Sequence, residues 1–509
     1  MGEVVLGVDV GTSSLKAGLF TLDGTPLGLA QAEYPLASPE EGAEEQDPQD
    51  WWAALAIVSR ELMALLDDPA RLAAVSIGGQ APTLVAADAE FMPTHPAITW
   101  LDQRPADEAD RLYAQLGRSV PVWGSWPAQA AWFVRHRPAA LRSTRWLFGC
   151  PDYLASRLTR AASTLLSTPP AELEAAEIDT RLMPPMAVPG KVIGQVDRAA
   201  AAETHLPAGT LVVGGFVDGV LGVLGSGVRR PGDACMNCGT SGTFSTVCLP
   251  PLGYPMMGIS ILGSATNTSG KALDWFAHQI APGGAGYAEL IAEAATTPPG
   301  SDGLLFLPHL AGERAPERDP RSRAAWVGLT LGHDRRHLLR ALLEGVAFSF
   351  RSIQDWVESC GAEVRDVRCV GGQARSEVWN QIKADILNRP VLVPSVVEAA
   401  VLGAAILAAL GLGAYASLEQ AIAAMVTVSR TLEPDARNAE LYGRMLEGYR
   451  ELYPALRQTN WRLHDLSTGS THASDFSDLS VGSGAPGGAG GTSPAGFGSA
   501  CPGAPAMAP

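Results

Sequence analysis

Residues 4–16 read VVLGVDVGTSSLK, and this stretch decides the fold. Its first five residues are apolar or glycine, which predicts a buried strand, and a second strand is expected from Leu15 to Leu22. Asp9 stands at the end of the first strand, and the turn after it carries a glycine and hydroxyl groups. Such a turn lets a phosphate approach the backbone closely. An ordinary hairpin turn is the alternative on this stretch alone.

A second copy of the pattern begins near residue 229. Strands are expected at 234–236 and 243–247, and Gly239-Thr240-Ser241-Gly242 lies between them. Two lobes that each open with a strand, a GTS turn and a strand predict a duplicated α/β fold with a cleft between the copies. Two facing turns of this kind can hold the β- and γ-phosphates of a nucleotide.

The remaining periodicity divides the chain into two domains, 1–228 and 229–465. After Asp465, Gly, Ser, Ala and Pro dominate, which predicts a disordered tail over 466–509. The other expected elements are a helix capped by Asp47, a strand over 73–77, a helix over 337–357, a strand over 365–370, a helix over 376–387, a strand over 391–393 and an alanine-rich helix from Glu398.

Asp218 follows the apolar strand 211–217, which is interrupted by Gly214 and Gly215. Ligands of open α/β sheets bind beside the carboxyl ends of the strands. A carboxylate there can accept the proton of a hydroxyl that attacks a phosphate. A helix N-cap is the alternative for this residue.

Gly371-Gly372-Gln373-Ala374-Arg375-Ser376 follows another predicted strand and begins a helix. Glycines let a flat ring lie against the backbone, so an adenosine site is one interpretation of this segment. A plain strand-to-helix turn is the other.

Composition excludes several classes of function. The chain has 509 residues, with 37 Lys+Arg against 53 Asp+Glu, a formal net charge of −16. Such a surface repels nucleic acid and anionic membranes, so a small molecule is the expected partner. We expect a cytoplasmic protein, because no signal peptide and no apolar run of membrane-spanning length is visible. Cys235 and Cys238 form a lone C-x-x-C, which is interpreted as strand residues and not as a metal site.

In order, these segments resemble the FGGY family of carbohydrate kinases, of the actin-like, ribonuclease-H-like ATPase superfamily. The resemblance covers residues 3 to about 460 and rests on the number and order of the matching segments. These are residues 9–16, 100–104 (WLDQR), 214–218, 237–242, 312–316 (GERAP), 327–330, 342–347, 371–376 and 398–405.

The resemblance implies two ribonuclease-H-like domains, ATP and Mg²⁺ as nucleotide and metal, and a sugar or polyol as acceptor. By similarity, Asp218 is the catalytic base and Asp9 lies near Mg²⁺. The residues implied at the phosphates are Thr12, Ser13, Lys16 and Thr240; at the adenosine, Gly372, Gln373, Ser376 and Asn380; and in the acceptor pocket, Gln80, Ala81, Trp100, Asp102, Trp126 and Phe216.

The WLDQR block is similar to the xylulokinase-like branch, which favours a pentulose such as xylulose, but two segments depart from the family pattern. Gln80 is followed by Ala81-Pro82-Thr83, where xylulokinases carry Met-His and glycerol kinases Arg-Glu. A polar contact to the acceptor is therefore missing. The segment after Arg157-Leu158-Thr159 is also altered. Trp123, Trp126 and Phe216 are candidates for an apolar wall.

Three alternatives stay open. The acceptor is a ketose or polyol in the main hypothesis, and glycerol or an aldonate in the second. In the third, the chain is a non-catalytic actin-like sugar sensor or ATPase. A homodimer is also left open.

Overall fold

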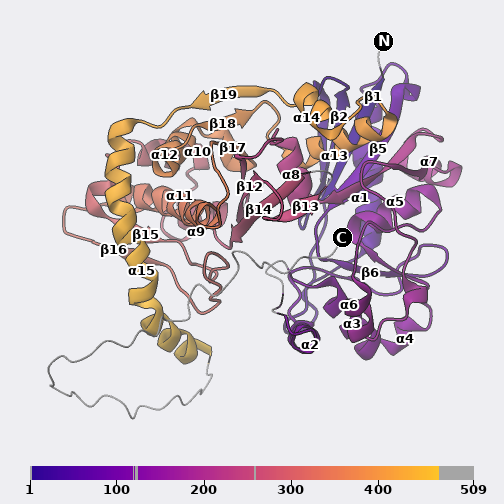
Figure 1. Cartoon of the computed structure of the whole chain (residues 1–509), viewed down its shortest axis with the longest axis horizontal. Helices are drawn as coiled ribbons and strands as arrows, with labels where there is room; N and C mark the ends of the chain where they lie inside the picture. The colour runs from indigo at the N-terminus through magenta and orange to yellow at the C-terminus, as the bar shows by residue number, and fades with distance from the viewer. Residues whose placement is uncertain (1–2, 119, 121–123, 257–258, 282, 469–509) are drawn as a thin grey trace.

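In the computed structural model, two β-sheets of matching topology organise the chain (Figure 1). The structure describes residues 3–118, 120, 124–256, 259–281 and 283–468. The indigo and purple strands form one lobe, and most of the pink and orange elements form the other.

The first sheet has the strand order β3-β2-β1-β5-β10-β9. β1, β2 and β3 are antiparallel neighbours, whereas β1, β5 and β10 run parallel. In sequence order the strands are β1 (Val4–Val10), β2 (Ser14–Thr21), β3 (Pro26–Glu33), β5 (Leu72–Gly79), β9 (Val192–Gln195) and β10 (Leu211–Val217).

The second sheet repeats this plan in the order β13-β14-β12-β11-β17-β18-β19. β11, β12 and β14 are antiparallel neighbours, and β11, β17 and β18 run parallel. The predicted duplication is therefore confirmed. The strands are β11 (Asp233–Cys238), β12 (Gly242–Cys248), β13 (Tyr254–Met256), β14 (Ile259–Thr266), β17 (Asp366–Val370), β18 (Val391–Pro394) and β19 (Val428–Leu432).

Smaller elements surround both sheets. The first lobe adds a sheet of order β4-β7-β6-β8. Its elements are β4 (Glu45–Gln46), α1 (Pro48–Met63), η1 (Pro69–Arg71), β6 (Leu84–Ala87), β7 (Ala97–Ile98), α2 (Ala106–Gln115), α3 (Trp126–His136), α4 (Pro138–Leu141), β8 (Trp146–Gly149), α5 (Cys150–Thr159), α6 (Pro170–Ala175), η2 (Thr180–Leu182) and α7 (Arg198–Thr204). The second lobe adds α9 (Gly270–Gln279), α10 (Tyr287–Ala294), η3 (Ser301–Gly303), β15 (Leu305–Leu307), β16 (Ala325–Val327), α11 (Arg335–Ser359), η4 (Gly372–Arg375), α12 (Glu377–Leu387) and α15 (Ala436–Thr468).

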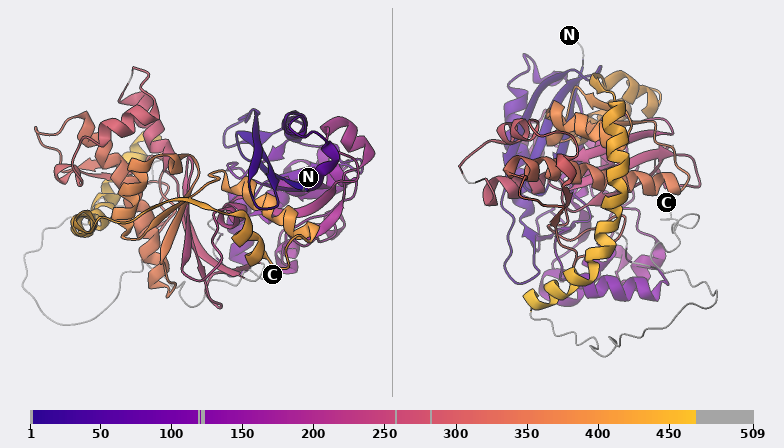
Figure 2. Two further views of the ribbon diagram at one scale, coloured as in Figure 1. Left: turned by 90° about the horizontal axis from the view of Figure 1, so that it is seen from above. Right: turned by 90° about the vertical axis from the view of Figure 1, so that its left-hand side faces the viewer.

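Three helices join the lobes. α8 (Asp218–Gly225) follows β10 and reaches β11, while α13 (Ala399–Leu412) and α14 (Leu418–Met425) follow β18 but pack on the first sheet. Figures 1 and 2 show these two orange helices beside the indigo strands. α13 is apolar all round, as a helix buried on every side must be. The predicted boundary at 228/229 divides the chain in sequence order. In space, however, α13 and α14 come from beyond this boundary and pack on the first sheet.

Glycines allow the backbones to meet at this junction. A Cβ on Gly7 of β1 would lie 2.0 Å from the carbonyl oxygen of Val401, and one on Gly403 would lie 2.0 Å from that of Leu221. A side chain at either position would push α13 away from β1 or from α8.

The predicted strands and helices all occur, with ends that differ by a few residues. Asp47 caps α1 as predicted, accepting a bond from the Gln49 amide at 2.9 Å. α15 continues through Thr468, into the first residues of the predicted tail, and 469–509 lie outside the described residues. In the described part of the chain, no helix combines the length and the apolar character needed to cross a membrane.

We expect Gly403→Ala to destabilise the protein by roughly 1–3 kcal/mol, because the added methyl group overlaps the α8 backbone. Gly443→Ala in α15 is the matched control. A Cβ there meets nothing within 4 Å, so alanine should stabilise by about 0.5–1 kcal/mol. Thermal or denaturant unfolding measures both. Equal stability of the two variants would contradict the packing at Gly403.

Candidate functional site

The first GTS turn joins β1 to β2 and is held from behind through its carbonyl groups. The Tyr34 hydroxyl donates to the Gly11 carbonyl at 2.6 Å, and Gln46 Nε2 donates to the Thr12 carbonyl at 2.6 Å. Trp100 Nε1 donates to Thr12 Oγ1 at 2.9 Å. Ser13 is exposed at the tip. The turn is thus fixed in position while one side of it stays open.

The second GTS turn joins β11 to β12 at the equivalent place. The amides of Ser269 and Lys271 donate to the Thr240 carbonyl, each at 3.1 Å, and the Gly270 amide donates to the Gly239 carbonyl at 2.9 Å. The start of α9 therefore anchors this turn, and Thr240 remains exposed. Asn237 stands in β11 where Asp9 stands in β1.

Asp9 and Asp218 lie near one another, at the carboxyl ends of β1 and β10. Loss of water and, after it, the negative charge of Asp218 together raise the pKa of Asp9 to about 7. Loss of water also raises the pKa of Asp218 to about 6, although the hydrogen bond that the Gly219 amide donates to its carboxylate at 2.6 Å acts to lower it. Asp218 is the first residue of α8 and Val217 is the cap, so the helix-cap alternative does not hold.

A chain of ion pairs links the strand after the first GTS turn to residues 371–376, the predicted adenosine turn. Lys16 Nζ lies 2.8 Å from Glu398 Oε2, and Arg375 lies 3.2 Å from Glu398 Oε1. Lys16 is also the β2 partner of Asp9, and its positive charge lowers the pKa of that carboxyl. Glu398, which caps α13, therefore holds two cations that come from different lobes.

The predicted adenosine turn lies between β17 and α12. Gly372 is exposed, and a Cβ there would meet nothing within 4 Å, so a ring can approach it. Gln373 Nε2 donates to Ser269 Oγ at 2.7 Å, which joins this turn to the second GTS turn. Ser376 caps α12, accepting from the Trp379 amide at 3.2 Å.

Asn380 lies below the adenosine turn and is fully buried. Its Nδ2 donates to the Ala374 carbonyl at 2.7 Å. In this conformation the side chain supports the turn from inside and presents nothing to a ligand above it.

Among the predicted acceptor-pocket residues, Trp100 is 36% exposed, and Ala81 and Phe216 are half-buried. These three retain surface for a ligand. Trp100 also contacts the first GTS turn, so it connects the phosphate and acceptor parts of the prediction.

The other three predicted pocket residues are buried and paired within the protein. Gln80 Nε2 donates to Gln46 Oε1 at 2.7 Å. The carboxylate of Asp102, with no exposed surface, pairs with Arg104 at 2.7 Å. Trp126 Nε1 donates to the Phe148 carbonyl at 3.0 Å, inside an apolar cluster. Their placement supports the surrounding loops, and direct contact with an acceptor stays a prediction. Trp123 lies outside the described residues.

Sequence reasoning missed the residues that hold the site from behind. Tyr34, Gln46 and Ser269 lie outside both GTS turns, and no local pattern distinguishes them. Glu398 begins a matching segment, but its pairing with Lys16 was not predicted. The one available signal was the similarity of the two turns, which indicates that the carbonyl groups of each turn need hydrogen-bond donors from another segment.

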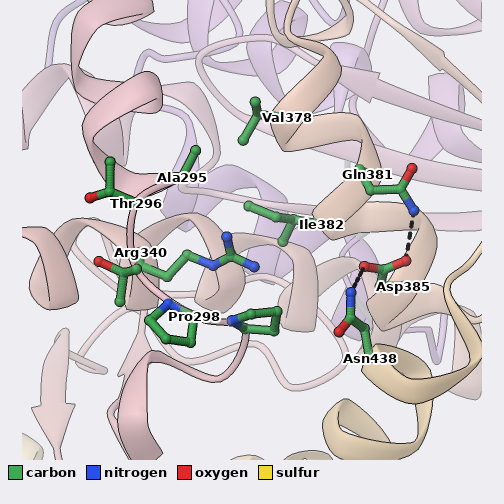
Figure 3. Close-up of a pocket in the computed structure, with 11 residues that line it drawn as sticks. Ala295, Thr296, Pro298, Arg340, Val378, Gln381, Ile382, Asp385 and Asn438 are labelled. Atoms are coloured by element: carbon green, nitrogen blue, oxygen red, sulfur yellow. Dashed lines mark hydrogen bonds between the residues drawn. The ribbon is translucent and has the colours of Figure 1, made fainter.

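A separate recess of 440 Å³ lies in the second lobe, between α10, α11, α12 and α15 (Figure 3). The dashed lines mark bonds to the Asp385 carboxylate from Gln381 at 2.8 Å and Asn438 at 2.9 Å. Arg340 lines its floor, already bonded to Glu344. None of the predicted site residues lines this recess.

Comparison with known proteins gives the family. The N-terminal domain of the FGGY family of carbohydrate kinases matches residues 4–168, and the C-terminal domain of that family matches 234–412. The chain belongs to the FGGY family of carbohydrate kinases. With this membership and the two-lobed fold, it is an ATP-dependent carbohydrate kinase.

Three relatives illustrate the likeness. The xylulose kinase of Bacillus subtilis is 27% identical over 493 residues, which span 91% of this chain and 99% of that protein. The crystal structure of xylulose kinase from Rhodospirillum rubrum has a TM-score of 0.79 and 31% identity, covering 90% of this chain and all of that one. The gluconokinase of B. subtilis is 27% identical over 92% of this chain and 99% of its own.

Replacing Asn380 by leucine tests its place below the adenosine turn. The variant leaves the buried Ala374 carbonyl without its donor, so we expect a loss of about 1–3 kcal/mol of stability. Thermal unfolding without nucleotide measures this. A raised KM for ATP with an unchanged unfolding temperature would instead show that Asn380 contacts the nucleotide directly.

Proposed function

We propose that this enzyme transfers the γ-phosphate of ATP to a hydroxyl of a pentulose of the xylulose type, with Asp218 as the base. The observation that carries this is the electrostatic proximity of Asp218, after β10, to Asp9, at the end of β1 just before the first GTS turn. The xylulose kinases that match over nearly the whole chain support the choice of acceptor.

The roles follow from position and chemistry. The open sides of the GTS turns, with Thr12, Ser13 and Thr240, would hold the phosphates. Lys16 would add positive charge there once it leaves Glu398. Gly372 and Gln373 would lie against the adenosine. Asp218 would accept the proton of the attacking hydroxyl, and its raised pKa makes it a stronger base than an ordinary carboxylate.

The residues at the end of β1 suit Mg²⁺. Asp9 Oδ1 is buried and lacks a hydrogen-bond partner among the described residues, although a buried carboxylate oxygen ordinarily has one. Carboxylate oxygens are the protein ligands that Mg²⁺ prefers. Asp9 would therefore hold the ion, which when bound neutralises charge on the phosphates.

The acceptor wall is less polar than in the family pattern. The Ala81-Pro82 segment offers no polar side chain, and its Pro82 carbonyl is bonded to Gln129 Nε2 at 3.2 Å. Recognition would then rest on Trp100, Phe216 and Asp218, which suits a small, flexible acceptor. Gluconate is the second candidate, because a gluconokinase matches with the same identity and coverage.

Closure of the two lobes would exclude water from the transferred phosphate. The Lys16–Glu398–Arg375 ion pairs lie between the lobes, where such a movement would act on them. We place the enzyme in the cytoplasm, where its ATP is available.

Incubation of the purified enzyme with Mg·ATP and a panel of acceptors tests the proposal. We expect ADP release with xylulose, and less with ribulose, gluconate and glycerol. Asp218→Asn should lower turnover by about 10²–10⁴-fold while the variant still binds ATP, because only the proton acceptor is lost. Faster turnover with gluconate would overturn the pentulose assignment. ADP release that is independent of any acceptor would overturn the assignment of a sugar acceptor.

The pH profile is a second test of Asp218. It is measured at saturating Mg²⁺, because Asp9, with a pKa raised to about 7, would otherwise titrate in the same range. A base must be ionised, and loss of water raises the pKa of this carboxyl to about 6. Activity should therefore be lost as the pH falls through about 6, and kcat/KM should drop about tenfold for each further pH unit. An ordinary aspartate would keep activity down to a pH of about 4. A profile that is flat to that point would show that the base is not Asp218.

A further inference from the structure

Two thiols and an ammonium group form a buried cluster beneath the nucleotide turns. The Sγ atoms of Cys238 and Cys369 are 3.8 Å apart. Lys383 Nζ lies 3.5 Å from the first sulfur and 3.7 Å from the second. All three residues are at most 1% exposed. None of them has a part in the proposed transfer.

The two cysteines of the cluster come from neighbouring strands, Cys238 from β11 and Cys369 from β17. They are not the C-x-x-C pair of the sequence, Cys235 and Cys238. In the parallel pair of β11 and β17, Met236 lies opposite Cys369, and Cys238 is two residues further on the same face. Cys235 points to the opposite face, into a different apolar cluster. Lys383 comes from α12 and also lies over the Trp379 ring, 4.9 Å from its centroid.

The cluster favours one thiolate over the other. The hydrogen bond between the two sulfurs and the positive charge of Lys383 lower the pKa of Cys369 to about 7, against the effect of burial. Burial raises the pKa of Cys238 well above its usual value. The Lys383 ammonium lies within 3.7 Å of both sulfurs and stabilises a thiolate at this pair, and the second sulfur lies 3.8 Å from the first.

We propose that Cys238 and Cys369 form an oxidative modification site, in which a peroxide converts the two thiols to a disulfide. The Cys369 thiolate attacks one oxygen of hydrogen peroxide and the O–O bond breaks. The departing hydroxide takes up the proton that the Cys369 thiol gave up, which leaves a sulfenic acid and one water. Cys238 then attacks the sulfenic sulfur, the S–O bond breaks, and the hydroxyl group leaves with the Cys238 thiol proton as a second water. Two thiols and one peroxide thus give one disulfide and two waters.

The cross-link would change the nucleotide site directly. The sulfurs must move from 3.8 Å to about 2.0 Å. Cys238 immediately precedes Gly239 of the second GTS turn. A Cβ on Gly371 would lie 2.8 Å from the Cys238 carbonyl oxygen, so both turns rest on this residue. Oxidation should therefore displace Thr240 and Gly372 together and weaken ATP binding.

The two turns lie closer to solvent than the cluster does. Gly239 and Gly372 are exposed, whereas the sulfurs of Cys238 and Cys369 are not. If peroxide enters past these turns, a nucleotide lying on both of them would cover its path, so ADP should slow the oxidation. The cross-link itself does not depend on the acceptor proposed above.

The full-length enzyme is treated with hydrogen peroxide, with and without ADP, and digested without reduction. We expect a cross-linked peptide pair containing residues 238 and 369, lighter by two hydrogen atoms. The KM for ATP should rise about tenfold, and dithiothreitol should restore it. Cys369→Ser and Cys238→Ser should each abolish both effects. Cys235→Ala, on the same strand but the opposite face, should retain them.

Lys383→Met leaves both thiols in place and removes the charge, so it should form the cross-link more slowly at neutral pH. Oxygen added to a single cysteine without a cross-link, a link between Lys383 and a sulfur, or an unchanged mass would each overturn the proposal. A cross-link that leaves the KM for ATP unchanged would overturn it as well, because the disulfide is proposed to weaken ATP binding.

Discussion

Backbone contact between α13, α8 and β1 holds the two lobes in register. Gly7, Gly225 and Gly403 allow it, because a Cβ at any of them would lie 2.0 Å or less from a carbonyl oxygen of the facing helix. The contact sets where α13 begins, and therefore where Glu398 lies. It also fixes α8, whose first residue is Asp218. The acid at the end of β10 and the ion pairs at the junction thus depend on the same close approach.

Electrostatics at the junction is a consequence of that packing. Asp9, Asp218 and Glu398 bring negative charge together, and Lys16 and Arg375 oppose it. Such an arrangement raises carboxyl pKa values, and it also favours a cation and a proton acceptor. Glu398 binds both cations, Lys16 from β2 and Arg375 from the turn after β17, so this one carboxylate connects the two lobes.

The duplication gives the two GTS turns different supports on a common plan. The first is held by side chains of Tyr34, Gln46 and Trp100, whereas the second is held by backbone amides at the start of α9. Beneath the second turn lies the cluster of Cys238, Cys369 and Lys383, where the first lobe has the apolar Val10 in place of Cys238. Equivalent positions have thus diverged in chemistry while the strand order was retained.

The sequence by itself determined the strands, the two GTS turns, the position of Asp218 after β10 and the family resemblance. These rest on local pattern, because alternation, glycine and hydroxyl residues act over a few positions. Only the tertiary structure decided that Asp102, Trp126, Gln80 and Asn380 are buried supports in this conformation, that Glu398 pairs with Lys16, and that Cys238 faces Cys369 and not Cys235. Burial and long-range pairing depend on which strands and helices become neighbours. Which elements become neighbours depends on packing between segments that are up to hundreds of residues apart, so it cannot be predicted from any short segment.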